Sequence, residues 1–141
     1  MATRYAKRLQ KELMELQVSP PTGIRVEEAN DLSRWVIGID GTTGSLYQGE
    51  KFSLQFRFND GYPLEAPEVI FIGKPPVHPH IYGNGHICLS ILYDHWSPAL
   101  TVLSICLSIL SMLSSCTEKV RPVDDSVYVS RAVGKSPKDT R

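Results

Sequence analysis

The amino-acid sequence predicts a single domain of the α+β class, and three observations lead to this prediction. Apolar residues recur every three or four positions near the N-terminus, every second position between residues 24 and 72, and almost continuously between residues 97 and 115. The first spacing is typical of a helix and the second is typical of a strand. With 141 residues, of which 42% are hydrophobic, the chain can bury the core of one domain.

The first expected element is an N-terminal helix. Ala6, Leu9, Leu13 and Leu16 fall on one side of it, and Ser19-Pro20-Pro21 ends it. The opposite side is basic, through Arg4, Lys7, Arg8 and Lys11. Such a stripe is either a solvated surface or a docking site for an acidic partner.

Strands follow at residues 34–39, 51–58 and 68–72, within a period-two region that begins near residue 24. The turn sequences DGTTGS and NDGYP separate them, so we expect a four-stranded antiparallel meander. After Ile72 come about twenty irregular residues rich in Pro and Gly. A loop of this length is unusual in a compact domain unless it has a function.

The next element is a helix with Ser97 as its N-cap and Pro98 as its first residue. It is apolar almost all round, so we expect it to lie buried across the sheet. Polar residues dominate after Thr117, which predicts a core domain of residues 1–130 and a flexible tail of residues 131–141.

Composition indicates which classes of partner the protein lacks and in which cellular compartment it is found. Fifteen Lys and Arg balance fifteen Asp and Glu, so no overall field attracts nucleic acid or an anionic membrane. The apolar stretch at 97–115 contains serines and is shorter than the roughly 20 apolar residues of a membrane span. The three cysteines form no even disulfide framework, and no signal segment opens the chain. We expect a cytoplasmic and nuclear protein without nucleic-acid or membrane partners.

Residues 78–88, HPHIYGNGHIC, hold three of the four histidines and one of the three cysteines. A zinc site is one interpretation, but Pro79 stiffens the chain between His78 and His80, and the usual pairs of closely spaced ligands are missing. We therefore expect no metal. A Cys/His hydrolase is a second interpretation, but such enzymes place their histidine far downstream, and only His95 follows Cys88.

In the third interpretation the Cys88 thiol carries an acyl group and passes it to an amine. Gly83 and Gly85 would let a partner backbone approach. The segment HPHIYGNGHICLSIL, followed by WSPA, is similar to the active-site signature of ubiquitin-conjugating enzymes. The basic helix ending in Pro-Pro, Trp35, LYQGEKF (46–52) and YPLEAPEV (62–69) extend the resemblance over residues 4–130.

The chain most resembles the W type of this family, in which a histidine, here His80, replaces the Asn of His-Pro-Asn. W-type enzymes are described as attaching ubiquitin to the α-amino group of flexible N-termini. The resemblance implies the ubiquitin-conjugating-enzyme fold. The chain departs from the family at its C-terminal region, where too little apolar sequence follows Val129, so we expect a reduced region without the family's final two helices. The resemblance further implies no cofactor, because the upstream activating enzyme uses the ATP.

The resemblance also implies roles for individual residues. Cys88 would carry the thioester, and Asp124 or Asp125, of which we favour Asp125, would supply a carboxylate beside it. His80 would donate a hydrogen bond to the oxyanion, accept the amine proton, or only order the loop. Ser90 stands where many members have Asp. His78 is expected to be structural, with its ring bonded to backbone, and His86 to face solvent.

The expected partners are ubiquitin, the activating enzyme, RING or U-box ligases, and protein substrates with flexible N-termini. The resemblance implies that the basic helix face, through Arg8 and Lys11, meets the activating enzyme and ligases. It places an apolar seat for a RING or U-box ligase on two loops, one with Pro63 and Leu64 and the other with Trp96, Ser97, Pro98 and Ala99. Two alternatives remain open. The chain could be a catalytically silent ubiquitin- or ligase-binding module, or a carrier of another ubiquitin-like modifier.

Overall fold

The computed structural model describes residues 3–140, with the side chains of residues 3 and 4 left out. Arg4 of the predicted basic stripe therefore lies outside the described side chains. Three helices, α1 (Thr3–Val18), α2 (Val102–Ser114) and α3 (Asp125–Arg131), accompany four strands in the described part. The strands are β1 (Ile24–Asp31), β2 (Arg34–Asp40), β3 (Lys51–Arg57) and β4 (Glu68–Ile72), and Ser90–Leu92 and Pro137–Asp139 form short 3₁₀ helices. The sheet has the order β1-β2-β3-β4 with every pair antiparallel, which confirms the predicted meander.

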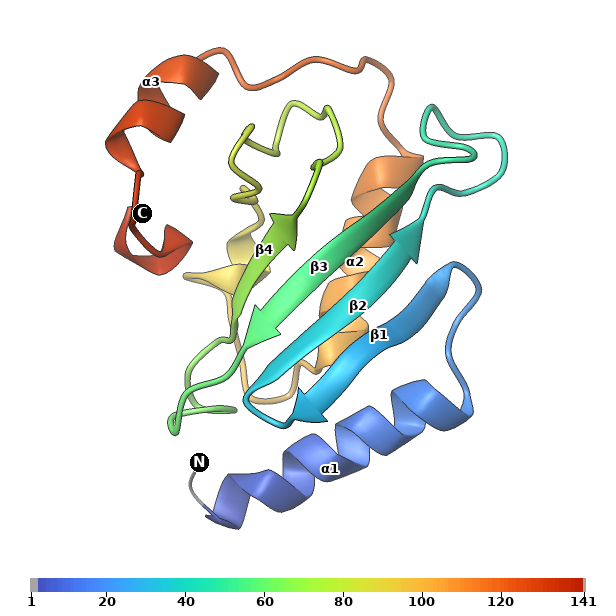
Figure 1. Ribbon diagram of the computed structural model, residues 1–141, viewed down its shortest axis with the longest axis vertical. Helices are drawn as coiled ribbons and strands as arrows, with labels where there is room; N and C mark the ends of the chain where they lie inside the picture. The colour runs from blue at the N-terminus through green and yellow to red at the C-terminus, as the bar shows by residue number, and fades with distance from the viewer. Residues whose placement is uncertain (1–2, 141) are drawn as a thin grey trace.

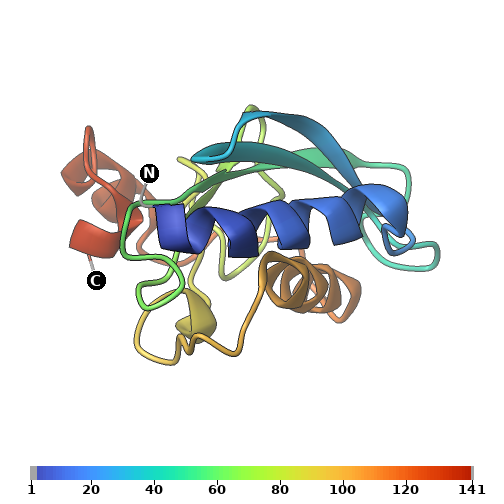
Figure 2. The same ribbon diagram turned by 90° about the horizontal axis from the view of Figure 1, so that it is seen from below.

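Helix α2 covers one face of the sheet, and α1 lies beside β1 and α2 (Figures 1 and 2). The covered face buries cross-strand pairs such as Trp35 with Phe56 and Ile37 with Leu54, because alternate residues of a strand point to the same side. Ile105 and Ile109 of α2 are fully buried in the same core. In the part of the chain that the structure describes, no helix combines the length and apolarity that a membrane crossing needs.

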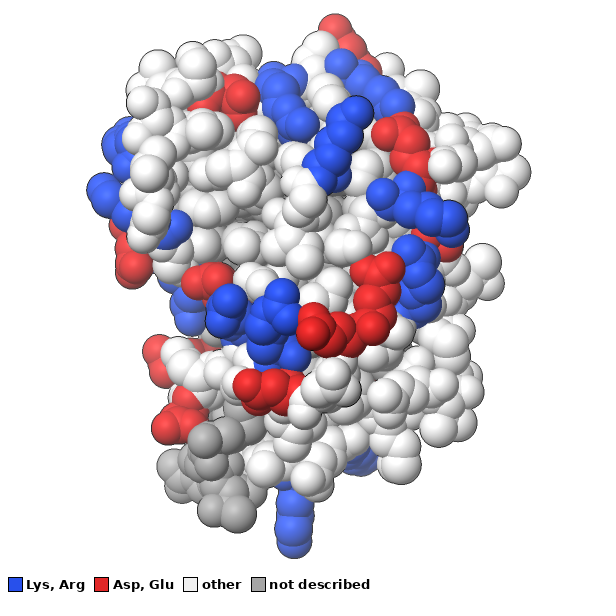
Figure 3. Space-filling model, viewed as in Figure 1, with Lys and Arg blue, Asp and Glu red and all other residues white. Residues whose placement is uncertain are grey.

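The opposite face of the sheet is charged and solvated. Figure 3 shows Lys, Arg, Asp and Glu side by side over this face. Arg25 pairs with both Asp40 and Glu27, and Arg34 pairs with Glu28. Exposed ion pairs of this kind contribute about 1 kcal/mol or less each. These charged side chains keep this face of the sheet exposed to solvent.

Helix α2 begins later than predicted, so the assignment of Ser97 as its N-cap was wrong. Thr101 is the N-cap: its hydroxyl accepts from the Ser104 N–H at 3.1 Å, and the Ser104 hydroxyl accepts from the Thr101 N–H at 3.2 Å. This reciprocal pair satisfies two backbone N–H groups at the helix start. Ser97 instead accepts from the Ala99 N–H at 3.2 Å, and residues 97–100 form a turn.

The expectation that both of the family's final helices are missing was also wrong, since one α-helix, α3, follows α2 in the described residues. It forms because Tyr128 and Ala132 bury their side chains, with the Tyr128 ring stacked on Tyr82 at 3.8 Å between centroids. Beyond α3, Lys138 Nζ donates to the Ala66 carbonyl at 2.7 Å, and Pro137 is buried. The flexibility of residues 131–141 and the boundary at residue 130 stay predictions.

Candidate active site

Cys88 lies half-buried on the long loop, directly across from His80. The Cys88 N–H donates to the His80 carbonyl at 2.8 Å, and the neighbouring residues Ile81 and Ile87 form an antiparallel bridge. The His80 side chain is exposed. Backbone pairing therefore holds the two segments together and leaves a thiol and an imidazole accessible from solvent.

His78 fixes the shape of this loop, as predicted. Its Nδ1 accepts from the His80 N–H at 2.9 Å, so the proton is on Nε2, which donates to the Met112 carbonyl at 3.2 Å. The ring is buried, and this burial lowers the pKa of His78. The expectation that His78 is structural and bonded to backbone is confirmed.

His86 does not face solvent, and that expectation was wrong. Gly85 has a φ of +91°, and its amide group pairs with β4 through a hydrogen bond from the Phe71 N–H to the Gly85 carbonyl of 3.0 Å. A Cβ at Gly85 would lie 2.0 Å from the Phe71 carbonyl oxygen, so only glycine permits this approach. The chain then runs along the sheet edge, which turns His86 inward.

The buried His86 ring joins the active-site loop to α3. Its Nδ1 lies 2.8 Å from the Tyr128 hydroxyl, which in turn lies 2.6 Å from the Thr140 hydroxyl. Because the Thr140 hydroxyl donates to the Pro137 carbonyl, Tyr128 donates to Thr140 and His86 donates from Nδ1 to Tyr128. Burial lowers the pKa of His86, as it does for His78.

Both candidate carboxylates contact the loop that leads to Cys88. Asp125 Oδ1 accepts from the Gly83 N–H at 2.8 Å, and Asp124 accepts from the Tyr82 hydroxyl at 3.2 and 3.3 Å. Burial, followed by the Asp124 contact, raises the pKa of Tyr82 to about 12, and Cys88 contributes a smaller electrostatic effect. The two carboxylates anchor α3 on residues 82 and 83.

Two open hollows adjoin the loop. One lies beside His80 and is lined by His78, Pro79, His80, Met112 and residues 115–118. The other lies beside Ser90, between Tyr82, Tyr93, Asp94 and Tyr128. Among residues 3–140, no three His, Cys, Asp or Glu side chains converge to hold a metal ion. Open surface hollows of this kind suit extended polypeptide chains better than a small enclosed ligand.

A family model described as "Ubiquitin-conjugating enzyme" matches residues 8–137, which is nearly the whole chain. The chain belongs to this family. Enzymes of the family are transferases that act through a thioester intermediate, so the acyl-carrier interpretation of the sequence is confirmed in this general form.

Relatives and solved structures refine this placement. The chain is 70% identical over 141 residues to "Probable ubiquitin-conjugating enzyme E2 W" of Dictyostelium discoideum, covering 100% of this chain and 95% of that protein. It is 55% identical over 139 residues to "Probable ubiquitin-conjugating enzyme E2 W-A" of Danio rerio, covering 96% and 91%. These relatives place this ubiquitin-conjugating enzyme in the W type, as the resemblance implied.

The fold agrees with the same family. The crystal structure of the ubiquitin-conjugating enzyme E2 UbcA1 from Agrocybe aegerita matches with a TM-score of 0.92 and 46% identity, covering 97% of this chain and 100% of that one. The predicted ubiquitin-conjugating-enzyme fold is therefore confirmed. Ubiquitin, an activating enzyme and ligases are the partners that membership of this family implies.

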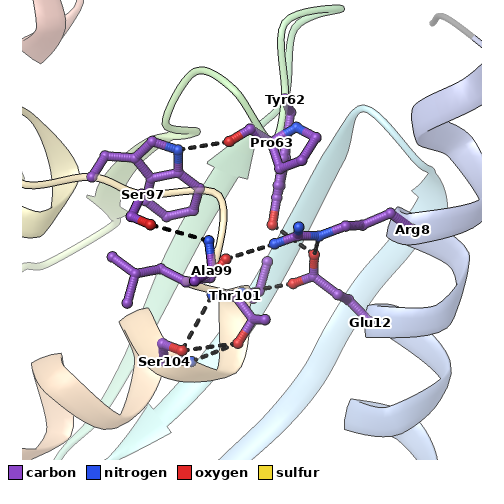
Figure 4. A network of polar contacts seen from close by, with 11 residues as sticks. Arg8, Glu12, Tyr62, Pro63, Ser97, Ala99, Thr101 and Ser104 are labelled. Carbon is purple, nitrogen blue, oxygen red and sulfur yellow. Dashed lines mark hydrogen bonds and ion pairs between the residues drawn. The ribbon is translucent and has the colours of Figure 1, made fainter.

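The residues expected to face these enzymes gather at the other end of the molecule, around Glu12. Figure 4 shows the Glu12 carboxylate between α1 and two loops. It accepts from Arg8 Nε at 3.0 Å, from the Tyr62 hydroxyl at 2.7 Å and from the Val102 N–H at 2.8 Å. Arg8 also donates to the Leu100 carbonyl at 2.7 Å. We call these five residues the Glu12 network.

The Glu12 network positions the predicted partner surface, but one residue predicted for that surface, Arg8, makes its hydrogen bonds inside the protein. The Arg8 guanidinium is partly buried and bonded within the protein, whereas Lys11 is exposed. Leu64 is 65% exposed, and Ser97, Pro98 and Ala99 are exposed in the facing loop. Trp96 joins the two loops by donating from Nε1 to the Pro63 carbonyl at 2.8 Å, and Pro63 is buried. Lys11, Pro98 and Ala99 line one shallow hollow together with Arg8 and Glu12.

Sequence reasoning missed several residues that hold these sites together. Glu12 had a detectable signal, because it lies three residues after Leu9 and four before Leu16, on the apolar side of α1. A carboxylate in such a position is expected to be paired inside the protein. Arg121, which donates to the Ile81 carbonyl, was also missed. Tyr82, Tyr128 and Arg121 had no such signal, since their partners are about 40 residues away in the chain.

Proposed function

We propose that Cys88 is the cysteine that carries ubiquitin as a thioester and that the acceptor is the α-amino group of a flexible protein N-terminus. The observation that carries this proposal is the hydrogen bond between the Cys88 N–H and the His80 carbonyl, which aligns an accessible thiol with the residue that distinguishes the W type. Support comes also from the exposure of His80 and from the hollow beside it.

Two acyl transfers make up the reaction. The Cys88 sulfur attacks the thioester carbonyl carbon of ubiquitin on the activating enzyme, a new C–S bond forms, and the activating enzyme's cysteine leaves as a thiolate. The acceptor amine then attacks the same carbon, a C–N bond forms, and the C–S bond to Cys88 breaks. The amine gives up a proton, and Cys88 is released as a thiolate.

The amine chemistry supports an α-amine acceptor. At about pH 7.4 about a quarter of an α-amine is deprotonated, whereas only about a thousandth of a lysine amine is. Machinery for removing the lysine proton then matters less, which accords with Ser90 at a position where many members have Asp. Ser90 is exposed beside one of the two hollows. We expect Ser90→Asp to raise transfer to free lysine relative to an N-terminal peptide, and an unchanged ratio would contradict this account.

His80 is the proposed donor to the oxyanion that forms when the amine attacks. Loss of one such donor typically slows acyl transfer by about 10²–10³-fold. We expect His80→Asn to retain much of the transfer that His80→Ala loses, because the Asn amide can also donate. Equal rates for the two variants would leave His80 without a donor role.

A charging assay tests the assignment of Cys88. The protein is incubated with activating enzyme, ATP and ubiquitin and run on a non-reducing gel with and without thiol, beside Cys88→Ala. A thiol-labile adduct one ubiquitin heavier, absent in Cys88→Ala, is the expected result. No adduct from a folded protein would favour the silent binding module, and an adduct only with another ubiquitin-like modifier would favour the second alternative.

RING or U-box ligases are the proposed partners of the surface around Leu64 and Pro98. Leu64 is largely exposed in one loop, and Pro98 is exposed in the facing loop that the Glu12 network holds in place. Leu64→Glu should therefore abolish ligase-stimulated discharge and leave charging by the activating enzyme intact. Lys11→Glu is the matched variant on α1 and should instead slow charging.

A further inference from the structure

The loop that carries His80 cannot satisfy its own backbone. Pro75, Pro76 and Pro79 have no N–H, so the segment between β4 and Ile81 has three fewer backbone donors than backbone acceptors. Pro75 and Pro76 are buried, and buried carbonyl groups need donors to offset their desolvation. The donors for these carbonyls therefore come from outside the loop.

One side chain supplies most of them. Arg121 Nη1 donates to the Pro76 carbonyl at 2.6 Å and to the Ile81 carbonyl at 3.1 Å, and Nη2 donates to the Pro75 carbonyl at 3.3 Å. Tyr47 adds a hydrogen bond to the Val77 carbonyl at 2.5 Å. Among the described residues Arg121 makes no ion pair with a carboxylate, so the bonds found for its guanidinium all go to this loop.

The Arg121 contacts lie on both sides of His80. Pro76 precedes the His78-Pro79-His80 segment, Ile81 follows it, and His78 and Ile81 form a bridge. The His80 backbone is bonded to the His78 ring through its N–H and to Cys88 through its carbonyl. A single rigid guanidinium thus fixes the two ends of the segment that places His80 against Cys88.

We propose that Arg121 is a positioning residue for ubiquitin transfer, which sets where His80 stands relative to Cys88. The inference rests on the proposed role of His80. Arg121 acts through the loop and not on ubiquitin or the acceptor. A displacement of about 1 Å of a group in the reacting geometry can slow a reaction by about a hundredfold. Charging by the activating enzyme depends on the Cys88 thiol and should be affected much less than discharge.

Arg121→Met removes the three hydrogen bonds, and Lys119→Met is the matched control. Lys119 is a cation two residues earlier that contacts Glu50 and the Tyr47 ring but none of the loop carbonyls that Arg121 contacts. Cys88–ubiquitin thioester is preformed, and its discharge to a peptide with a flexible N-terminus is followed over a range of peptide concentrations. We expect Arg121→Met to lower the maximal rate of discharge by about ten- to a hundredfold. The half-saturating peptide concentration and the rate of charging should stay within about twofold of those of the unaltered protein. Lys119→Met should discharge like the unaltered protein.

The decisive measurement repeats Arg121→Met in a His80→Ala background. If Arg121 acts through His80, the second substitution should change the maximal rate by less than about twofold, whereas independent effects would multiply. An undiminished effect in that background, or equal losses of charging and discharge, would overturn the inference while leaving the role of His80 intact. If His80→Ala alone discharges normally, both the role of His80 and the inference fail. If Arg121→Met does not fold, the same comparison with and without His80→Ala is made with Arg121→Lys, which keeps the charge but not the planar fork of donors.

Discussion

The two functional ends of the molecule are each held by one charged side chain, and they use it in opposite ways. At the partner end, Glu12 of α1 accepts hydrogen bonds from Arg8 of the same helix and from two elements far away in the chain, the loop before β4 and the start of α2. At the active-site end, Arg121 donates to three carbonyls of one loop. One residue joins separate elements, and the other orders a single segment.

This difference determines what each end can tolerate. Glu12 is only 7% exposed, so its loss would leave buried donors without partners and loosen the packing of α1 against α2. Arg121 is half-buried, and two other hydrogen bonds also hold the loop: the Tyr47 hydroxyl donates to the Val77 carbonyl, and the His80 N–H donates to the His78 ring. We therefore expect damage at the partner end to appear in stability and damage at the active-site end to appear in rate.

The largest effect is expected for Glu12→Ala. The substitution leaves two buried donors, the Tyr62 hydroxyl and the Val102 N–H, without their acceptor, and each unsatisfied buried donor typically costs about 1–3 kcal/mol. The partly exposed Arg8 keeps its hydrogen bond to the Leu100 carbonyl. Urea denaturation measures the free energy of unfolding. Glu15→Ala, an exposed change one turn along α1, is the control and should stay within about 0.5 kcal/mol. Equal losses of unfolding free energy for the two variants would show that the Glu12 network does not stabilise the partner end.

At the active-site end, Tyr128→Phe is expected to cost about 1–3 kcal/mol, because it leaves the buried His86 Nδ1 without its acceptor. The loss should be local. Hydrogen exchange should speed up in α3 and in residues 82–86 while α1 stays protected. Faster exchange throughout the protein would show instead that α3 is part of the global folding unit.

Thr101→Ala should destabilise the protein by about 1 kcal/mol, the usual value of a helix N-cap. The matched variant is Ser97→Ala, which lies outside α2 and should change the free energy of unfolding by about 0.5 kcal/mol or less. This pair of variants tests whether residues 97–100 form a separate turn or belong to the first turn of α2. The reverse order of the two effects would restore Ser97 as the cap.

The smallest expected effect is a dependence on pH confined to the active-site end. Burial lowers the pKa of both His78 and His86, so each binds a proton more weakly in the folded protein than in the unfolded chain. The free energy of unfolding should therefore be undiminished above the unfolded value of about 6.5 and fall as the pH drops below it. Protonation would also put a hydrogen on His78 Nδ1, which faces the His80 N–H.

Amide hydrogen exchange, corrected for its intrinsic pH dependence, measures this effect. Each of the two histidines can lower the protection of residues 78–88 by at most about tenfold per pH unit, the change that one full proton would give. Residues of α1 are the internal control. Equal losses of protection in α1 and in the loop would show that the two ends are not independent.

The sequence by itself determined the α+β fold, the four-stranded meander, the loop with His80 and Cys88, and the family to which they belong. These features depend on local spacing or on short contiguous motifs, which a single chain displays directly. It also predicted the backbone-bonded role of His78, because that ring contacts a residue two positions away.

Only the tertiary structure decided how these parts are held. Thr101 rather than Ser97 begins α2, His86 points inward, α3 docks through Tyr128, and Arg121 reaches carbonyls 40 or more residues away. Each of these outcomes depends on which groups from distant segments meet in the folded chain. A buried polar group takes whichever partner the packing brings within hydrogen-bonding distance, and the order of residues along the chain does not specify that partner.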